Sequence, residues 1–386
     1  MADTLKTAYT LLRGFVSFDA PQEIVPCLRG TPGLGKSDIV KQLAQDLATE
    51  SSTHSPEGCA LCGTLVPRVH ADGSCTLEPI GAHVKLIDVR LANFDPIEVK
   101  GLPVVHNGET VWGTPSWFPT NNTEEVILFF DEIFNAPPAV QNVALQILLD
   151  RQLHQVRLGD RVRIVAAGNR GDDGTFTAKV STALATRLAI IDIEVDPQDW
   201  IEWAREQGLV PELVAAVEYN PKVLVFNKNS RSTPRTVSKL ARLVGRLATT
   251  QSRPVHEMVR QFGPAVIGES AAIELAAFIE LMETVNPRDV VERGVIPKFP
   301  DAAKKFATVC AVAQYVAKTK NLKDKEVDNC LAFCKAVGDE YAIKFLSLCN
   351  LQKNRTLLAT LLKKEEFRAL VQVAAQALGV GSLLSK

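Results

Sequence analysis

The sequence predicts an α/β fold in which a parallel sheet is covered by helices on both faces and is followed by a helical region. Two observations predict it. Over residues 1–195, short apolar runs alternate with segments of helical periodicity, as strands and crossover helices do in a parallel sheet. From residue 196 onward the strand-like runs stop, and Ala, Leu and Val recur at helical spacing.

Strands are expected where short apolar runs are bounded by turn residues, at 24–30, 83–90, 126–130, 163–167 and 188–195. The run at 126–130 is apolar throughout, which is typical of a strand buried on both faces. Helices are expected over 36–48 and 140–148, because the apolar residues of each segment fall on one helical face.

Capping residues predict where the helical region begins. Asp196 and Pro197 suit an N-cap and first helical position, and Gly208 suits the stop that follows. A second helix is expected to start at Thr233 and Pro234. One segment fits neither pattern: residues 51–81 are rich in Gly, Pro, Ser and Cys, which predicts an inserted loop or small module.

Length and charge limit the classes of protein to which the chain can belong. A chain of 386 residues is expected to form two or three domains. Its 43 Lys and Arg balance 44 Asp and Glu, so nucleic-acid binding by bulk charge is not expected, although a local basic stripe can exist within a neutral total. No apolar run approaches the ~18 residues of a membrane span, and the first residues lack a secretory signal pattern. We therefore expect a cytoplasmic protein whose eight cysteines are free thiols or metal ligands.

The first chemical motif fits the P-loop pattern G-x-x-x-x-G-K-[ST] in full. Its glycines let backbone N–H groups surround a polyanion, and the helix that follows directs its positive end at the phosphates. Lys36 is expected to reach the β- and γ-phosphates, and the Ser37 hydroxyl to bind Mg²⁺. The nucleotide-binding residues are Gly30, Thr31, Pro32, Gly33, Leu34, Gly35, Lys36 and Ser37.

The second motif is Asp131-Glu132, which follows the apolar run at 126–130. A buried strand that ends in two carboxylates places them at the sheet edge where the P-loop also opens. Asp131 is expected to hold Mg²⁺ and Glu132 to polarise the attacking water. Together the two motifs predict hydrolysis of ATP or GTP.

With these motifs in order, the chain resembles an AAA+ ATPase with a P-loop NTPase αβα core, and within that class the MoxR-type branch. The resemblance covers about residues 10–270. It implies that Asn169 is the first sensor, that Arg187 is an arginine finger acting on the neighbouring subunit, and that Arg235 contacts the γ-phosphate from a helical lid. Arg170 is the alternative finger. The implied domains are a core at 1–195 with the insert at 51–81, a lid at 196–270 and a helical C-terminal domain at 271–386.

Arg235 also has an independent physical argument. If Thr233 caps a helix, Arg235 lies in the first turn, where a cation opposes the helix dipole by roughly 0.3–1 kcal/mol. A phosphate-facing role explains that unfavourable choice. Residues 91–103, ahead of an aromatic segment at 111–119, resemble a pore-lining loop, and residues 151–164 resemble the β-hairpin region before the first sensor.

The resemblance implies an ATP-driven, ring-forming remodelling or chaperone-like motor, hexameric in most such proteins, that acts on a protein client. It also implies ATP and Mg²⁺ as cofactors, and a partner with a von Willebrand factor A domain. Two alternatives stay open: a nucleic-acid motor or restriction-type NTPase, against which Asp95 and Glu98 of the pore segment count, and a nucleotide-gated scaffold, against which Glu132 counts.

A last constellation lies in the insert. Cys59 and Cys62 form a C-x-x-C-G turn, and His70 and Cys75 can complete a tetrahedral Zn²⁺ site; reduced thiols in an unstructured insert are the alternative. The other cysteines sit in apolar surroundings and are expected in the core. Trp112, Trp117 and Phe118 are expected either to pack in the core or to grip a polypeptide.

Overall fold

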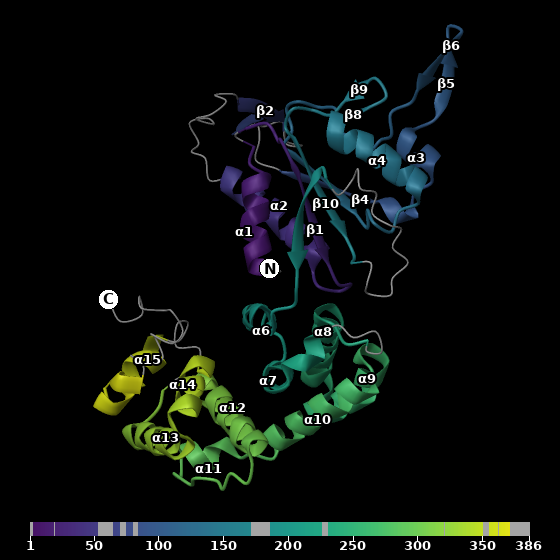
Figure 1. The fold of residues 1–386 in the computed structure, drawn as a ribbon. Helices are drawn as coiled ribbons and strands as arrows, with labels where there is room; N and C mark the ends of the chain where they lie inside the picture. The colour runs from purple at the N-terminus through teal and green to yellow at the C-terminus, as the bar shows by residue number, and fades with distance from the viewer. Residues whose placement is uncertain are drawn as a thin grey trace. The chain divides into compact units, whose positions relative to one another are not determined.

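The computed structural model describes residues 3–18, 20–52, 65–69, 75–79, 84–170, 186–225, 231–319, 321–349, 355–361 and 363–370. The chain forms two compact units, Met1–Asp199 and Trp200–Lys386 (Figure 1). The first contains a parallel sheet, and the described elements of the second are helical. This arrangement confirms the predicted fold class.

A five-stranded sheet forms the centre of the first unit, with the strand order β11-β1-β10-β7-β4 and every pair parallel. The five strands are β1 (Val25–Gly30), β4 (Lys85–Arg90), β7 (Val126–Asp131), β10 (Val162–Gly168) and β11 (Leu188–Ile193). Each lies on a run that the sequence predicted as a strand. Since the strands are parallel, all of their carboxyl ends meet at one edge.

One face of the sheet is covered by α1 (Leu5–Phe15) and α2 (Lys36–Ser52). Alternate strand residues point into this layer, because side chains change face at every residue. Ile127 and Phe129 of β7 therefore share a buried cluster with Leu12 of α1 and Leu43 of α2. The P-loop helix is thus fixed to the centre of the sheet.

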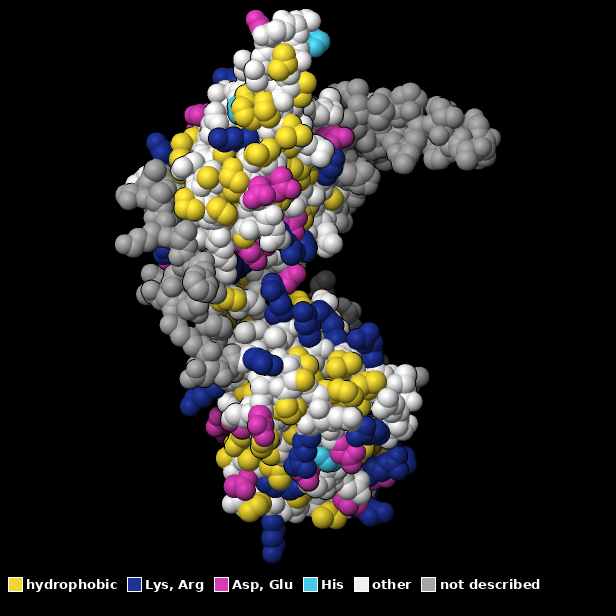
Figure 2. Space-filling model, turned by 90° about the vertical axis from the view of Figure 1, so that its right-hand side faces the viewer, with side chains coloured by type: hydrophobic (Ala, Val, Ile, Leu, Met, Phe, Trp, Pro, Cys, Tyr) yellow, Lys and Arg dark blue, Asp and Glu magenta, His cyan; other side chains and the backbone are white. Residues whose placement is uncertain are grey.

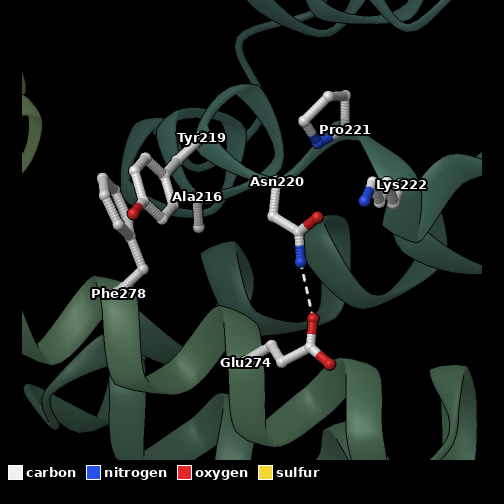
Figure 3. A pocket seen from close by; sticks show the side chains of 7 residues that line it. All are labelled: Ala216, Tyr219, Asn220, Pro221, Lys222, Glu274 and Phe278. Atoms are coloured by element: carbon white, nitrogen blue, oxygen red, sulfur yellow. Dashed lines mark hydrogen bonds between the residues drawn. The ribbon is translucent and has the colours of Figure 1, made fainter. Parts of the chain in front are cut away.

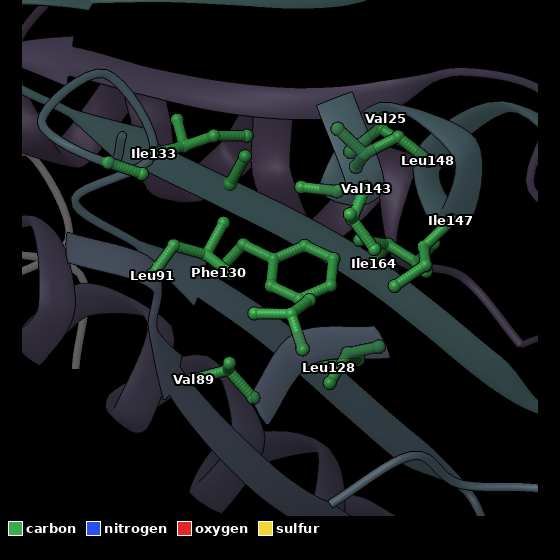
Figure 4. Packing of buried hydrophobic residues seen from close by; sticks show 14 of the residues in the cluster. Val25, Val89, Leu91, Leu128, Phe130, Ile133, Val143, Ile147, Leu148 and Ile164 are labelled. Atoms are coloured by element: carbon green, nitrogen blue, oxygen red, sulfur yellow. The ribbon is translucent and has the colours of Figure 1, made fainter. Parts of the chain in front are cut away.

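The opposite face carries α4 (Pro138–Asp150), and Figure 4 shows the packing there. Leu128 and Phe130, the alternate residues of β7, contact a cluster that includes Ile147 of α4. β7 is buried along its whole length, as its apolar run predicted. Asp131 is therefore held at the end of a strand that packing fixes on both faces.

Among the described residues, three antiparallel hairpins accompany the sheet. β2 (Leu65–Val69) pairs with β3 (Cys75–Pro79), β5 (Pro103–His106) pairs with β6 (Glu109–Trp112), and β8 (Gln152–Leu153) pairs with β9 (Val156–Arg157). The β5–β6 hairpin projects from the unit in Figure 1. Short helices η1 (Leu91–Asn93) and α3 (Pro96–Lys100) precede it. The predicted hairpin region before the first sensor is therefore present as β8–β9.

The second unit is built from helices packed around buried apolar clusters. Capping fixes α8 as predicted, since Thr233 accepts from the N–H of Thr236 and Pro234 is the first helical residue. Its elements are α6 (Pro197–Glu206), α7 (Pro211–Tyr219), η3 (Pro221–Leu224), α8 (Pro234–Gln251), α9 (Val255–Ile267), α10 (Glu269–Glu283), α11 (Pro287–Val291), α12 (Ala302–Lys318), α13 (Asp324–Val337), α14 (Asp339–Leu348) and α15 (Arg355–Leu361). The finer division into a lid and a C-terminal domain stays a prediction.

None of the described helices is long and apolar enough to cross a membrane. Five cysteines expected in the core are buried free thiols: Cys27, Cys310, Cys330, Cys334 and Cys349. Burial raises the pKa of Cys27 to about 12, so this thiol is protonated and unreactive near neutral pH.

Candidate active site

The P-loop turns between β1 and α2 with glycines where only glycine fits. Gly33 and Gly35 have φ of 79° and 105°, a region that L side chains rarely adopt. A Cβ on Gly30 would lie 2.8 Å from the carbonyl oxygen of Ile193 in β11. The loop therefore has the close backbone approach that a phosphate cradle needs.

Lys36 is buried at the base of this loop, with 7% of its surface exposed. Its Nζ donates to the carbonyl oxygens of Gly30 at 2.8 Å and Thr31 at 2.9 Å, and to Oδ1 of Asn169 at 3.0 Å. Asn169 directly follows β10, the neighbour of β1 in the sheet. The structure thus brings the P-loop lysine and the predicted sensor into direct contact.

Ser37 and Asp131 meet across the site. The Ser37 hydroxyl donates to Oδ2 of Asp131 at 2.7 Å, although 94 residues separate them. A hydroxyl and a carboxylate are the hard oxygen donors that Mg²⁺ prefers. These two residues therefore fit the Mg²⁺ role that the sequence predicted for them.

Glu132 holds an unusual backbone conformation, with φ at 57° in the left-handed region. Its N–H donates to Oδ1 of Asp131, and the N–H of the next residue, Ile133, donates to the carbonyl oxygen of Ala167 in β10. The surrounding hydrogen bonds fix the turn in which the two carboxylates follow one another.

A third carboxylate, Asp88 on β4, lies near this pair. Burial, followed by the negative charge of Asp131, raises the pKa of Asp88. Asp88 was not among the residues that the sequence motifs predicted for the site. Its presence as a carboxylate within the predicted strand 83–90 was the sequence feature that could have identified it.

Arg29 and Arg170 flank the other side of the site, against β11. Arg29 binds Asp192 through two hydrogen bonds of 2.6 Å, and this contact lowers the pKa of the carboxyl. Arg170 contacts Glu194 at 3.1 Å and the carbonyl oxygen of Ile193 at 3.3 Å. The alternative finger residue is therefore engaged within its own subunit, at the carboxyl end of the sheet.

Arg187 lies at the opposite end. It immediately precedes β11, and its side chain is exposed. Leu188 pairs with Val25 and Ile193 with Gly30, so the full length of β11 separates Arg187 from the P-loop. Six residues of strand span about 20 Å. Arg187 is thus not part of the cluster that Lys36, Ser37, Asp131, Glu132 and Asn169 form.

Arg235 is exposed in the first turn of α8, as predicted. It belongs to the second unit, and its proposed contact with a nucleotide stays a prediction. The zinc hypothesis also stays one. Cys59, Cys62 and His70 lie outside the described residues, and only the backbone of Cys75, in β3, is described.

The pore-loop prediction missed a β-hairpin. Asn107 and Gly108 occupy its turn with φ of 51° and 82°, the left-handed pair of a type I′ turn. The Asn-Gly dipeptide between two Val-containing runs was a recognisable signal. On this hairpin Trp112 stacks on His154 of the β8–β9 turn, with ring centroids 4.5 Å apart. The two hairpins therefore support each other.

The aromatic residues differ in burial, and the expected role in gripping a polypeptide stays a prediction. Trp117 packs against Phe118 and Phe130 in the core, whereas Trp112 is 37% exposed. Val104 and Val105 on the same hairpin are 55% and 74% exposed. The hairpin thus exposes more apolar surface to solvent than its own turn needs for stability.

A separate pocket of about 450 Å³ lies in the second unit between α7 and α10. Tyr219 and Phe278 stack there at 4.7 Å, and Asn220 donates to Glu274 (Figure 3). None of the predicted site residues lines it. We assign it no chemistry.

The comparison with protein families gives one match. Residues 93–188 match the model of the AAA domain (dynein-related subfamily). The matched range contains Asp131, Glu132 and Asn169, and the P-loop precedes it. Together the parallel sheet, the P-loop with its two carboxylates and this match define the class: the chain is an ATP-hydrolysing enzyme with an AAA domain at residues 93–188. No curated protein sequence matches it.

Several solved structures resemble the chain at low similarity. NtrX from Brucella abortus is 17% identical over 76% of this chain and 65% of its own, with a TM-score of 0.33. The RuvB Holliday junction branch migration motor of Thermotoga maritima is 16% identical over 81% and 80%, also at 0.33. PCH-2 of C. elegans is 12% identical over 72% and 67%, again at 0.33. At these scores the likenesses carry no conclusion about function.

Proposed function

We propose that the protein is a ring-forming AAA+ motor of the MoxR type that uses ATP hydrolysis to remodel a protein client. Within one subunit, Lys36 neutralises the β- and γ-phosphates, and Asn169 orients the γ-phosphate beside the attacking water. Arg235 approaches from the lid, and Arg187 from the neighbouring subunit. The expectations of a hexamer and of a partner with a von Willebrand factor A domain rest on resemblance alone.

The chemistry is attack of water on the γ-phosphorus of ATP. The bond to the β,γ-bridging oxygen breaks, and ADP and inorganic phosphate leave. Glu132 accepts the water proton, for which its place beside Asp131 at the strand end suits it. Ser37 and Asp131 would hold Mg²⁺, which supplies neutralisation of phosphate charge when bound.

The position of Arg187 carries the proposal of a ring. A cation that lies about a strand length from its own P-loop cannot serve its own nucleotide. An exposed guanidinium at that end of the sheet is free to enter the site of another copy, where it binds phosphoryl oxygens with fixed geometry. Trans-acting arginine fingers are worth about 10³–10⁵ in turnover.

The β5–β6 hairpin supports the proposal of a polypeptide client. Val105 and Trp112 are exposed on a hairpin that His154 braces, so apolar side chains are presented on a stiff support. Apolar contacts of this kind bind unfolded chains without sequence preference. Asp95 and Glu98 beside the hairpin cap α3, and these two acids outnumber the one cation of that helix, Lys100.

Mixing two inactive variants tests the ring. We expect Arg187→Ala to bind ATP and lose nearly all turnover, and Lys36→Ala to bind no ATP. In a mixed ring, intact P-loops of the Arg187 variant meet intact fingers of the Lys36 variant, so partial activity returns. Arg170→Ala is the matched control. Zero activity with demonstrated subunit exchange, or full turnover of Arg187→Ala alone, would show that Arg187 is not the finger.

A further inference from the structure

Helix α8 carries a stripe of cations on a single face. Arg235, Lys239, Arg242 and Arg246 are all exposed, and their spacing of four, three and four residues keeps them on one side of the helix. The opposite side is anchored, since Val237, Leu240, Ala241 and Val244 are completely buried. The cations therefore stand on a rigid support.

No carboxylate is mixed into this stripe. Between Glu218 and Glu257 the sequence has eight Lys and Arg and no Asp or Glu. This asymmetry is hidden in the whole chain, where 43 cations balance 44 acids. The two bordering acids are engaged elsewhere, Glu218 with Arg205 and Lys344, and Glu257 with Arg253.

The stripe is also unpaired as far as the structure describes the chain: Arg235, Lys239, Arg242 and Arg246 form no ion pair with a described residue. Arg242 instead lies over the ring of Trp203, with its guanidinium carbon 5.5 Å from the ring centroid. Exposed helices usually alternate charge signs to gain pairs along the helix. A helix with one sign only loses that gain, which indicates that the counter-charge comes from a bound partner.

We propose that Lys239, Arg242 and Arg246 of the α8 stripe form a docking surface for the phosphate backbone of a nucleic acid, whereas Arg235 at the end of the stripe keeps its role at the γ-phosphate. From Lys239 to Arg246 these cations extend over about 10 Å of helix. One nucleic-acid strand presents a phosphate every 3.4 Å along its axis, so a continuous row of anions matches a continuous row of cations. Figure 2 shows Lys and Arg side chains gathered on the helical unit.

A second copy of the chain is a weaker candidate for the counter-charge. Helix α10 has four acids and no Lys or Arg, but three of the four carboxylates already have partners. Glu274 binds Asn220, Glu280 binds Arg260, and Glu283 binds His256. The proposal goes beyond the ATP-driven motor and depends neither on ring formation nor on hydrolysis.

Binding to labelled 30-nucleotide probes, measured by fluorescence anisotropy across a salt series, tests the surface. The arms are single-stranded DNA, double-stranded DNA and RNA, with the full chain and no ATP. The variant Lys239→Gln/Arg242→Gln/Arg246→Gln leaves Arg235 intact. We expect its Kd to rise at least tenfold and its salt slope on double-stranded DNA to fall by about 2–3, since each lost phosphate contact contributes about 0.9.

The control variant Lys298→Gln/Lys318→Gln/Lys325→Gln removes the same charge from exposed positions of the same unit. It should bind within twofold of the unaltered chain. Because Arg242 packs on Trp203, Lys239→Gln/Arg246→Gln keeps the test valid if the triple variant unfolds.

Four results would overturn the assignment. The first is a Kd weaker than about 10⁻⁴ M for all three probes at 100 mM salt, below ordinary non-specific binding. The second is equal weakening by the control variant. The third is competition by polyglutamate that is as strong as competition by the nucleic acids at equal charge. The fourth is a stripe variant whose only change is its oligomeric state, measured by sedimentation. Preference among the three probes identifies the nucleic acid.

Discussion

Asn169 accepts a hydrogen bond from Lys36 at 3.0 Å, which ties the loop after β10 to the base of the P-loop. Lys36 is the first residue of α2, Asn169 directly follows β10, and the two are 133 positions apart in the sequence. The sensor side chain is thus in contact with the group that reaches the phosphates. A change in what Lys36 binds therefore changes the hydrogen bond that Asn169 accepts.

We expect Asn169→Ala to lower kcat by about 10²-fold, in the range seen when one group that stabilises the transition state is removed. Lys36 keeps its two backbone acceptors, so the Kd for ATP should change less than tenfold. Phosphate release and nucleotide titration measure the two effects. An equal loss of binding and turnover would show that Asn169 is only structural.

Lys36→Ala and Glu132→Gln should separate binding from turnover. Removing Lys36 takes the cation from the phosphates, so no binding is expected at millimolar ATP. Glu132→Gln keeps the cradle and removes the base, so binding stays and kcat falls by about 10²–10⁴-fold. Isothermal titration and a turnover assay report these outcomes. Loss of ATP binding in both variants would contradict the separate roles.

Val105→Asp should impair client handling without affecting the ATP site. Val105 is 74% exposed, so its change should alter stability by less than about 0.5 kcal/mol. Basal turnover is expected to be unchanged, whereas stimulation by a permanently unfolded model polypeptide should fall severalfold. Val295→Asp, at a site 53% exposed in the second unit, is the matched control. Equal stimulation of both variants would show that the hairpin does not bind the client.

The insert yields a prediction of metal content. If Cys59, Cys62, His70 and Cys75 bind zinc, the purified chain carries about one equivalent per subunit by metal analysis. Cys62→Ser should remove the metal and leave ATP binding intact. Zinc-free protein with unchanged stability and activity would exclude the site.

The Arg29–Asp192 pair makes a pH-dependent contribution to stability. The hydrogen bonds from Arg29 lower the pKa of Asp192 in the folded chain. The contribution is therefore fully present above the unfolded value of about 3.9 and is lost as pH falls through the lower folded value. Denaturant unfolding of the unaltered chain and Asp192→Asn should differ by less than about 1 kcal/mol at pH 7, and the difference should vanish in acid. A difference that grows with acid would refute this.

Local patterns predicted the five central strands, since apolar runs such as 126–130 are long enough to specify buried strands. The P-loop and Asp131-Glu132 were also predictable, because fixed spacing encodes their chemistry. The contact between Ser37 and Asp131 was not, as it depends on the order of strands in the sheet. The β5–β6 hairpin was missed because the resemblance to a pore loop outweighed Asn107-Gly108. Neither the partners of Arg170 nor the Asp88 environment follows from sequence spacing.

Glu132 lies in a conformation that a long side chain seldom adopts, and a strained residue of this kind costs on the order of 1–3 kcal/mol. Asn enters the left-handed region several-fold more readily than Gln or Glu. Glu132→Asn should therefore give a chain that melts at a higher temperature than Glu132→Gln, while both variants lose nearly all turnover. The residue that turnover requires at this position is therefore not the residue that gives the most stable fold. Selection for stability and selection for turnover oppose each other at Glu132.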